Sequence, residues 1–316
     1  MSIPKMTPEE IEVFMRKKTA LPVPTLLTVF LILMFAIPMA AAVTPIFVAP
    51  STVLKIVAAT LSPFVFAFLH LLVAGLLSMP FHKAIVPGKF PRNLSHFVYG
   101  PRRLYAICWT AIFYCTPLYH AFLSVPQTRK LMFWLFGYRG HSEVAIAPDA
   151  WIRDLPCLKF SKGVYTANKC TIGTNMCLSD GTIFVENITL GENTMIGHMV
   201  IIGPGTHTEG QVELGVNSAV GIRPRFGANC RVGPGCSVNH GAEIGESADI
   251  GPASYIGVKA KIGSGIKMPS ASNIPDGSVV QTQADLDAIL RNERNELLGL
   301  KQTLRHSFAD RVKKGA

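Results

Sequence analysis

Residues 244–263 read IGESADIGPASYIGVKAKIG, in which every sixth position begins an Ile-Gly pair. The same phase runs from Ile172 to Met268, where sixteen of seventeen positions are apolar and twelve are followed by Gly. Four residues after a phase position the residue is usually small or β-branched, as at Ser218 and Cys236. Two inward positions per hexad would fill a narrow core, so this pattern predicts a hexapeptide-repeat solenoid.

The repeat also predicts how the coils stack. Each hexad is expected to form a short strand and a tight turn, with glycine where the backbone bends sharply. Three hexads would close one coil of 18 residues, and coils would stack at about 4.8 Å. Residues 18 apart in sequence are therefore expected to be vertical neighbours. Because the phase never slips, no inserted loop is expected between Ile172 and Met268.

The pattern resembles the hexapeptide-repeat acyltransferase superfamily, which implies an all-β, left-handed parallel β-helix that forms trimers. The handedness comes from this resemblance alone. A second likeness lies in residues 79–83 (MPFHK), 116–119 (TPLY) and 135–140 (LFGYRG). These are similar to the membrane-bound hexapeptide region at the C-terminal end of poly-lysine synthetase and related peptide-synthetase-like proteins. That resemblance implies a solenoid held against the bilayer, which acts on a growing or lipid-linked acceptor.

Composition predicts a membrane protein. The chain has 49% hydrophobic residues, a mean hydropathy of +0.32 and a net charge of +10. Residues 26–48 and 56–79 lack charges and exceed the roughly 20 residues that span a bilayer. A cleaved signal peptide is disfavoured because the first stretch is too long and a second follows it. A nucleic-acid partner is not expected, since basic residues cluster near these spans or alternate with acidic ones.

The topology follows from the basic loops. Arg16–Lys18 and the loop 80–103 are basic, which places both on the cytoplasmic side of a two-helix hairpin. Residues 104–125 are uncharged but polar in places, and we interpret them as a re-entrant or interfacial segment; a third full span stays open. The chain is then a multi-pass membrane protein with a cytoplasmic solenoid. We expect residues 1–140 to form the N-terminal helix, transmembrane hairpin and interfacial helices, 141–275 the β-helix acyltransferase domain, and 276–316 a C-terminal amphipathic helix.

Some polar groups near the membrane need an interpretation. His70 and His120 lie in apolar stretches, where interhelical hydrogen bonding is favoured over a catalytic role. A basic cluster is expected to bind anionic headgroups; it comprises Lys83, Lys89, Arg92, Arg102 and Arg103. The seven cysteines show no metal-ligand spacing, so no metal is implied. Cys170, Cys230 and Cys236 fall at the small inward positions. At the N-terminus, Thr7 to Glu10 has the form of a capping box before a short helix.

The outer faces of the predicted coils differ in polarity. Two faces carry alternating charges, which are interpreted as solvated cross-strand pairs. The third face has no charge, and it comprises Ile183, Ile201, Ala219, Ser237 and Tyr255. A bare apolar stripe of this kind favours a subunit interface. We therefore predict a homotrimer that packs through this face.

Two histidines at outward corners flank the apolar face. His240 lies in Asn239-His240-Gly241, which is similar to the Asn-His-Asp signature of the sugar-amine and sialic-acid acetyltransferases, with Gly241 in place of Asp. His198 has Asp180 18 residues earlier, which is expected to lie beneath it and to orient the imidazole. Either histidine is a candidate general base for acyl transfer, and the two are not exclusive.

The donor is expected to be a thioester. Four cations are candidates to hold the phosphates of coenzyme A or of a phosphopantetheine carrier, and they are Arg223, Arg225, Lys259 and Lys261. A carrier-protein partner stays open beside free acyl-coenzyme A. The predicted function is a membrane-associated acyltransferase that acts on a hydroxyl or amine of a lipid-, glycan- or peptide-linked acceptor. The alternative is a non-catalytic trimeric scaffold anchored to the membrane, which the missing Asp after His240 favours.

Overall fold

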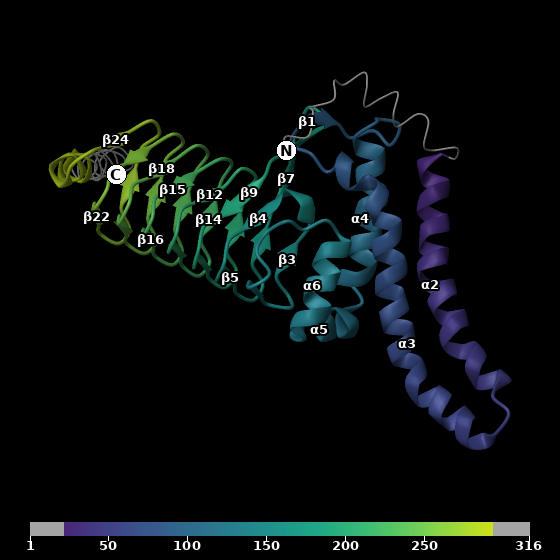
Figure 1. Cartoon of the computed structure of the whole chain (residues 1–316). Coiled ribbons are helices and arrows are strands. Elements are labelled where there is room, and N and C mark those ends of the chain that lie inside the picture. Colours follow the sequence, from purple (N-terminus) through teal and green to yellow (C-terminus); the bar gives the residue numbers. More distant parts are fainter. Residues whose placement is uncertain (1–21, 293–316) are drawn as a thin grey trace, which may run out of the picture. The chain divides into compact units, whose positions relative to one another are not determined.

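The computed structural model describes residues 22–292, so the expected capping box at Thr7 and the last part of the expected C-terminal helix lie outside the described residues. The chain forms two structural units. The first unit contains residues up to 162 together with 171–189 and 203–205. The second contains residues 163–170, 190–202 and those from 206 onward. Figure 1 labels their elements.

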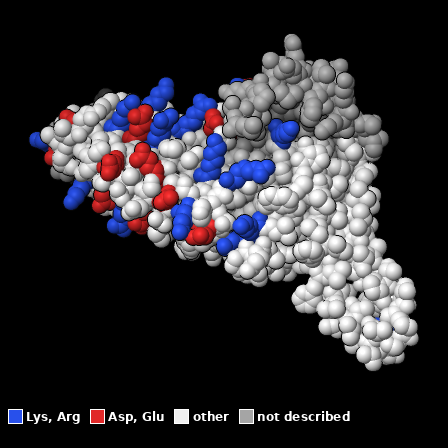
Figure 2. Space-filling view, viewed as in Figure 1, with Lys and Arg blue, Asp and Glu red and all other residues white. Residues whose placement is uncertain are grey.

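Between residues 22 and 135 the first unit contains five α-helices and one 3-10 helix. These are α2 (Val23–Val48), α3 (Thr52–Ser78), η1 (Met79–Ala84), α4 (Tyr99–Phe113), α5 (Thr116–Ser124) and α6 (Pro126–Leu135). Both predicted apolar segments are helical. The helices Val23–Val48 and Thr52–Ala84, of 26 and 33 residues, are long and apolar enough to cross a bilayer. Their surface in Figure 2 is almost free of charge.

The predicted third apolar segment is not one straight helix. Helices α4 and α5 meet at an angle of 83° around Tyr114 and Cys115. The polar indole N–H of Trp109 on α4 donates to the Ile152 carbonyl at 2.8 Å, within strand β3. Helix α4 is therefore tied to the first strands of the same unit, while α5 turns away from its axis.

His70 is fully buried and joins two other helices of the first unit. Its Nδ1 lies 2.7 Å from the Met34 carbonyl oxygen on α2. That carbonyl lacks its usual helical donor, because the residue four positions later is Pro38, which has no N–H. The Nε2 of His70 lies 3.5 Å from the Ala111 carbonyl at the end of α4. The interhelical hydrogen bonding predicted for His70 is thus confirmed, and it has a local cause.

Arg102, expected at the headgroups, is instead 2% exposed and forms a salt bridge with the fully buried Asp154. Thr174 and Asn175 also donate to Asp154. Burial alone would raise the pKa of Asp154, but the guanidinium of Arg102, assisted by Arg153 and these donors, holds that pKa below its usual value. A buried charge needs such a partner, which is why this arginine is not available to lipid.

The second unit is the solenoid, built from three parallel sheets of two-residue strands. We call them the β10, β11 and β12 sheets. The β10 sheet contains β5 (Tyr165–Thr166), β10 (Met195–Ile196), β13 (Glu213–Leu214), β16 (Arg231–Val232), β19 (Asp249–Ile250) and β22 (Lys267–Met268). The β11 sheet contains β11 (Ile201–Ile202), β14 (Ala219–Val220), β17 (Ser237–Val238), β20 (Tyr255–Ile256) and β23 (Asn273–Ile274). The β12 sheet contains β12 (His207–Thr208), β15 (Arg225–Phe226), β18 (Glu243–Ile244), β21 (Lys261–Ile262) and β24 (Val279–Val280).

The predicted spacing is confirmed from β10 onward. Met195 pairs with Glu213, and Ser237 pairs with Tyr255, each 18 residues apart. The phase residues fill the core, since Ile196 and Ile256 are fully buried. Burying one such side chain contributes roughly 1.5–3 kcal/mol. The small second position is confirmed too, because Cys170, Cys230 and Cys236 are almost fully buried.

The predicted absence of an insertion is wrong. Met195 pairs with Tyr165, 30 residues away rather than 18, so twelve extra residues lie between these two coils. In the first unit, strands β7 (Asn175–Cys177) and β8 (Thr182–Val185) form an antiparallel hairpin. Strand β8 also pairs with β1 (Gly88–Pro91), so the hairpin belongs to a separate three-stranded sheet. An insertion of twelve residues equals two hexads, and it leaves the phase unchanged.

The remaining strands of the first unit are short, and a helix follows the last solenoid strand. The short elements are β2 (Ala145–Ile146), β3 (Trp151–Ile152), η2 (Leu155–Cys157), β4 (Leu158–Phe160) and β6 (Thr171–Ile172), with β9 (Ile188–Leu190) shared between the units. Residues 283–292 are helical. Leu286 is fully buried, and the Gln283 side chain bonds to both the N–H and the carbonyl of Lys267. This helix therefore closes the last coil.

Candidate functional site

The two candidate bases lie at exposed corners of the solenoid. His198 lies between β10 and β11, and His240 lies between β17 and β18, so the two corners flank the β11 sheet as expected. Among residues 22–292 we find no hydrogen bond to the imidazole of His198. Its backbone carbonyl accepts from the N–H of Asn217 in the next coil. The corner is held by backbone bonds, which leaves the His198 ring to solvent.

The predicted partnership of Asp180 with His198 is wrong. Because twelve residues are inserted, the corner that neighbours His198 is formed by Asn168, whose carbonyl accepts from the N–H of Met199 at 3.1 Å. Asp180 lies in the turn of the β7–β8 hairpin and pairs with Lys89 at 2.6 Å. The hydrogen bond from Lys89, followed by those from Thr182, holds the pKa of Asp180 well below its usual range. Its carboxylate therefore bonds within the hairpin, to Thr182, and to Lys89 on strand β1.

His240, in contrast, has a hydrogen bond to its ring. The N–H of Ile222, in the preceding coil, donates to the Nδ1 of His240 at 2.8 Å. The neighbouring Asn239 of the predicted signature donates from its side chain to the Ile256 carbonyl at 2.8 Å. Both side chains therefore stabilise the corner. A base that acts through Nε2 would have to give up the bond at Nδ1, because a neutral imidazole carries only one proton.

The four candidate cations fall into two places. Arg225 and Lys261 are strand residues of the β12 sheet, two coils apart, with Glu243 between them. Lys261 pairs with Glu243 at 3.1 Å. Arg223 and Lys259 lie at the corner of His240, each in a left-handed conformation with φ of 56°. The structure thus brings one pair of cations together on a sheet and the other pair at a corner.

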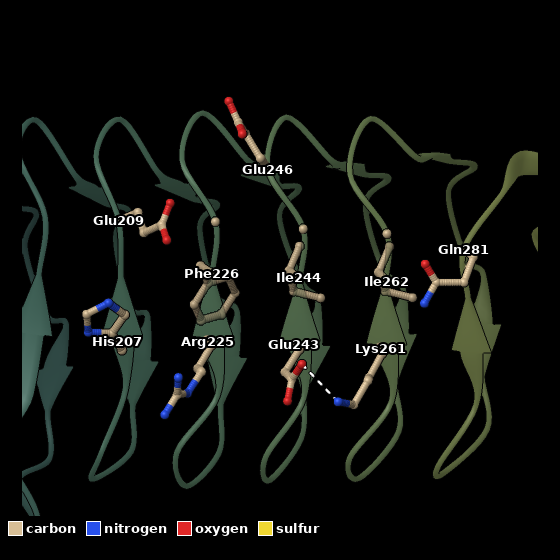
Figure 3. Close-up of a pocket in the computed structure, with 13 residues that line it drawn as sticks. His207, Glu209, Arg225, Phe226, Glu243, Ile244, Glu246, Lys261, Ile262 and Gln281 are labelled. Atoms are coloured by element: carbon tan, nitrogen blue, oxygen red, sulfur yellow. Dashed lines mark ion pairs between the residues drawn. The ribbon is translucent and has the colours of Figure 1, made fainter.

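A shallow groove of about 550 Å³ runs over the β12 sheet. In Figure 3, Arg225, Glu243 and Lys261 lie in a row along its lining, and His207 and Glu209 lie at one end. The sequence alone does not single out His207 or Glu209 as site residues, although His207 pairs with Arg225 on one of the two charged faces. The Glu209 carboxylate also accepts from the N–H of Ala228 at 3.0 Å. Three glutamates line the groove beside its cations, so its charge is mixed.

The apolar face is confirmed in four of its five members. Ile201, Ala219, Ser237 and Tyr255 pair in register along the β11 sheet. Ile201 is 55% and Tyr255 41% exposed. The fifth member, Ile183, is wrongly assigned: it belongs to β8, where it pairs with Phe90 and is 6% exposed. The hairpin insertion is again the reason.

The described part of the chain holds no group of three or more His, Cys, Asp or Glu side chains placed to bind a metal. Over the solenoid in Figure 2, positively and negatively charged side chains are intermingled. The ion pairs on the solenoid strands are solvent-exposed, as for Arg231 with Glu213 at 3.4 Å, which is typical of a solvated face.

No family model and no curated protein sequence matches the chain. Solved structures are similar to it. The acetyltransferase domain of PglB from Neisseria gonorrhoeae is 16% identical over 50% of this chain and 62% of that one, with a TM-score of 0.25. PerB from Caulobacter crescentus, solved with CoA and GDP-perosamine, is 13% identical over 48% of this chain and 60% of its own, with a TM-score of 0.23. Serine acetyltransferase from Neisseria gonorrhoeae is 15% identical over 84% and 96%, with a TM-score of 0.17. These scores are low, so the function proposed below rests on the chain's own geometry.

Proposed function

We propose that the protein is a membrane-associated acyltransferase that moves an acyl group from a thioester to a hydroxyl or amine of a lipid-, glycan- or peptide-linked acceptor. One observation carries this proposal: the imidazole of His198, to which no hydrogen bond is found among residues 22–292, stands at an exposed corner of a hexapeptide solenoid, beside an apolar sheet. The long apolar helices α2 and α3 support an acceptor that is held in or near the bilayer.

The chemistry needs one base and no covalent intermediate. The acceptor O–H or N–H gives its proton to the imidazole of His198 while its oxygen or nitrogen attacks the thioester carbonyl. The carbon–sulfur bond then breaks, and the proton passes to the departing thiolate. Arg223, Arg225, Lys259 and Lys261 would hold the donor's phosphates, whether the donor is acyl-coenzyme A or a phosphopantetheine on an acyl or peptidyl carrier protein.

Thiol release measures this function directly. Purified full-length protein is incubated with acetyl-coenzyme A or a long-chain acyl-coenzyme A, with and without native lipid extract. We expect release that depends on lipid and falls by about 10²–10⁴-fold in His198→Ala. His120→Ala is the matched control, because it removes an exposed histidine outside the solenoid. Equal release by wild type and His198→Ala would refute this base.

The membrane orientation is part of the proposal. The basic loop between η1 and α4 favours a cytoplasmic solenoid by the positive-inside rule. Cys177 offers a natural reporter, since it is exposed on β7 whereas the other cysteines are buried or half-buried. We expect a membrane-impermeant maleimide to label Cys177 in lysed cells but not in intact ones. Cys177→Ser is the control, and labelling in intact cells would place the hairpin outside.

The β11 sheet is the proposed subunit interface of a homotrimer. Its Ile201 and Tyr255 expose apolar surface without a charge on the same strands, which favours a partner of the same kind. We expect Ile201→Lys to shift the detergent-corrected mass from three chains to one. Met195→Lys is the matched control, because Met195 is 52% exposed on the β10 sheet. A mass of one chain in wild type would contradict the trimer.

One observation favours the alternative, a non-catalytic scaffold: the His240 ring is bonded to the Ile222 N–H and is not free to act as a base. The scaffold predicts that cells keep making the product when both His198 and His240 are changed to alanine. The acyltransferase predicts that the product is lost although the protein still assembles. Product analysis in cells that carry the double variant separates the two.

A further inference from the structure

The orientation of the His240 ring decides what its outer nitrogen can do. Its Nδ1 accepts the Ile222 N–H at 2.8 Å, so this nitrogen presents a lone pair. A neutral imidazole with an acceptor at Nδ1 carries its proton on Nε2. The ring packs closely against the preceding coil, because a Cβ added at Gly221 would lie 2.5 Å from Nδ1. The exposed end of His240 is therefore a hydrogen-bond donor.

The bond at Nδ1 is a recurring feature of this corner. Val220 pairs with Val238, and Ile256 pairs with Ile274, so His240 and Asp276 occupy equivalent positions two coils apart. The Asp276 carboxylate accepts the Val258 N–H at 2.7 Å, as His240 accepts that of Ile222. A carboxylate can therefore replace the imidazole as the acceptor at this corner, and the coil between them carries Val258, which has no side-chain acceptor.

Two cations stand on either side of the same corner. Arg223 follows Ile222 and Lys259 follows Val258, while Gly241 holds the equivalent position in the coil between them. Backbone bonds of 2.8 Å join these coils, from Gly241 to Ile222 and from Lys259 to His240. Gly241 has no side chain, and a Cβ there would lie 3.5 Å from the Lys259 Cγ. The Gly241 that replaces the expected Asp therefore removes a carboxylate from between two cations.

Two carboxylates in neighbouring coils have partners of their own. Glu243 pairs with Lys261 at 3.1 Å, and the Asp276 carboxylate is bonded to a backbone N–H. We propose that His240, Arg223 and Lys259 form an anion-binding corner, in which the Nε2–H of His240 donates to a phosphate oxygen of the acyl donor. The identity of that ligand rests on the proposed function. The corner itself is defined by the Nε2–H donor and the two cations. In this role His240 binds an anion and does not remove a proton.

The first test reads the tautomer and binds a probe without any turnover. The full-length protein is labelled with ¹⁵N-histidine, and the His240 signals are assigned from their loss in His240→Asn. We expect the pattern of an Nε2–H tautomer, and a shift of these signals with 3′,5′-ADP that adenosine does not produce. An Nδ1–H tautomer, or equal responses to the two probes, would overturn the proposal.

The second test separates the donor from a base. His240→Asn keeps both an acceptor for the Ile222 N–H and an N–H donor, whereas His240→Asp keeps only the acceptor, as Asp276 does. We expect the Kd of coenzyme A to change by less than about threefold in Asn and to rise by about tenfold or more in Asp, the size of one charge-assisted hydrogen bond.

Two outcomes of the second test contradict the proposal. Unchanged coenzyme A binding in His240→Asp would remove the donor role. Normal binding in His240→Asn with thiol release as low as in His240→Ala would make His240 the base. A failure of the proposed function alone gives a different result. Wild type would then release no thiol from any donor, while 3′,5′-ADP would still shift the His240 signals and so support the anion-binding corner.

Discussion

The regular coils and the β7–β8 hairpin carry apolar residues on the same six-residue phase, yet they bury them differently. In the coils, Ile196 and Ile256 are fully buried in the narrow core. In the hairpin, Leu178 is only half-buried, whereas the off-phase Ile183 is buried against strand β1. The six-residue phase therefore predicts whether an apolar residue is buried only where the chain forms regular coils.

The solenoid and the first unit also differ in how their charged side chains are paired. The solenoid pairs its charges on exposed strands, as in Lys261 with Glu243. The first unit buries Arg102 with Asp154, which ties α4 to the turn that precedes β4. Exposed pairs contribute little, whereas breaking a buried pair leaves an uncompensated charge in a dry environment.

The largest expected effect comes from breaking the buried pair. Arg102→Met should lower the free energy of unfolding by about 3–5 kcal/mol, because Asp154 stays buried without its partner. The matched change in the solenoid, Lys261→Met, should cost less than about 1 kcal/mol. Denaturant unfolding in detergent, followed by fluorescence of the buried Trp109, measures both. Equal losses in the two variants would contradict the contrast.

A core truncation tests the meaning of the phase. Ile196→Ala should cost about 2–5 kcal/mol, since it leaves a cavity in a fully buried position. Leu178→Ala, on the same phase but half-buried in the hairpin turn, should cost roughly 1 kcal/mol or less. The same unfolding experiment compares them. A large loss in Leu178→Ala would mean that the hairpin residue packs as a coil residue does.

The pH dependence of stability gives a smaller effect with a defined sign. The pKa of Asp154 is lowered in the folded chain, so its contribution is present above the unfolded value of about 3.9. That contribution is lost as the pH falls through the lower, folded pKa. We therefore expect Asp154→Asn to be less stable than wild type by a constant amount between pH 7 and 5. The difference should shrink below pH 4, as denaturant midpoints at each pH would show.

Much of the architecture could be predicted because it depends on periodicity and hydropathy. The two long apolar helices, the alternating charges on the strands and the inward cysteines all follow from residue type and its spacing along the chain. The hairpin could not be found in this way, since its twelve residues preserve the phase. The partner of Arg102 is 52 residues away in a turn without repeats. The role of His240 depends on a single 2.8 Å contact, which no spacing rule supplies.

The smallest expected effect tests the geometry that spacing alone predicted. If Asp180 oriented His198, Asp180→Asn would reduce thiol release nearly as much as loss of the base. In the structure Asp180 pairs with Lys89 across the three-stranded sheet, and Asn168 occupies the corner beside His198. We therefore expect Asp180→Asn and Lys89→Met to change thiol release by less than about twofold, while His198→Ala lowers it by about 10²–10⁴-fold. Each of these variants removes one partner of the same exposed ion pair. A loss of thiol release in Asp180→Asn but not in Lys89→Met would therefore assign the Asp180 carboxylate to the site of His198. A small and equal effect would assign it to the hairpin.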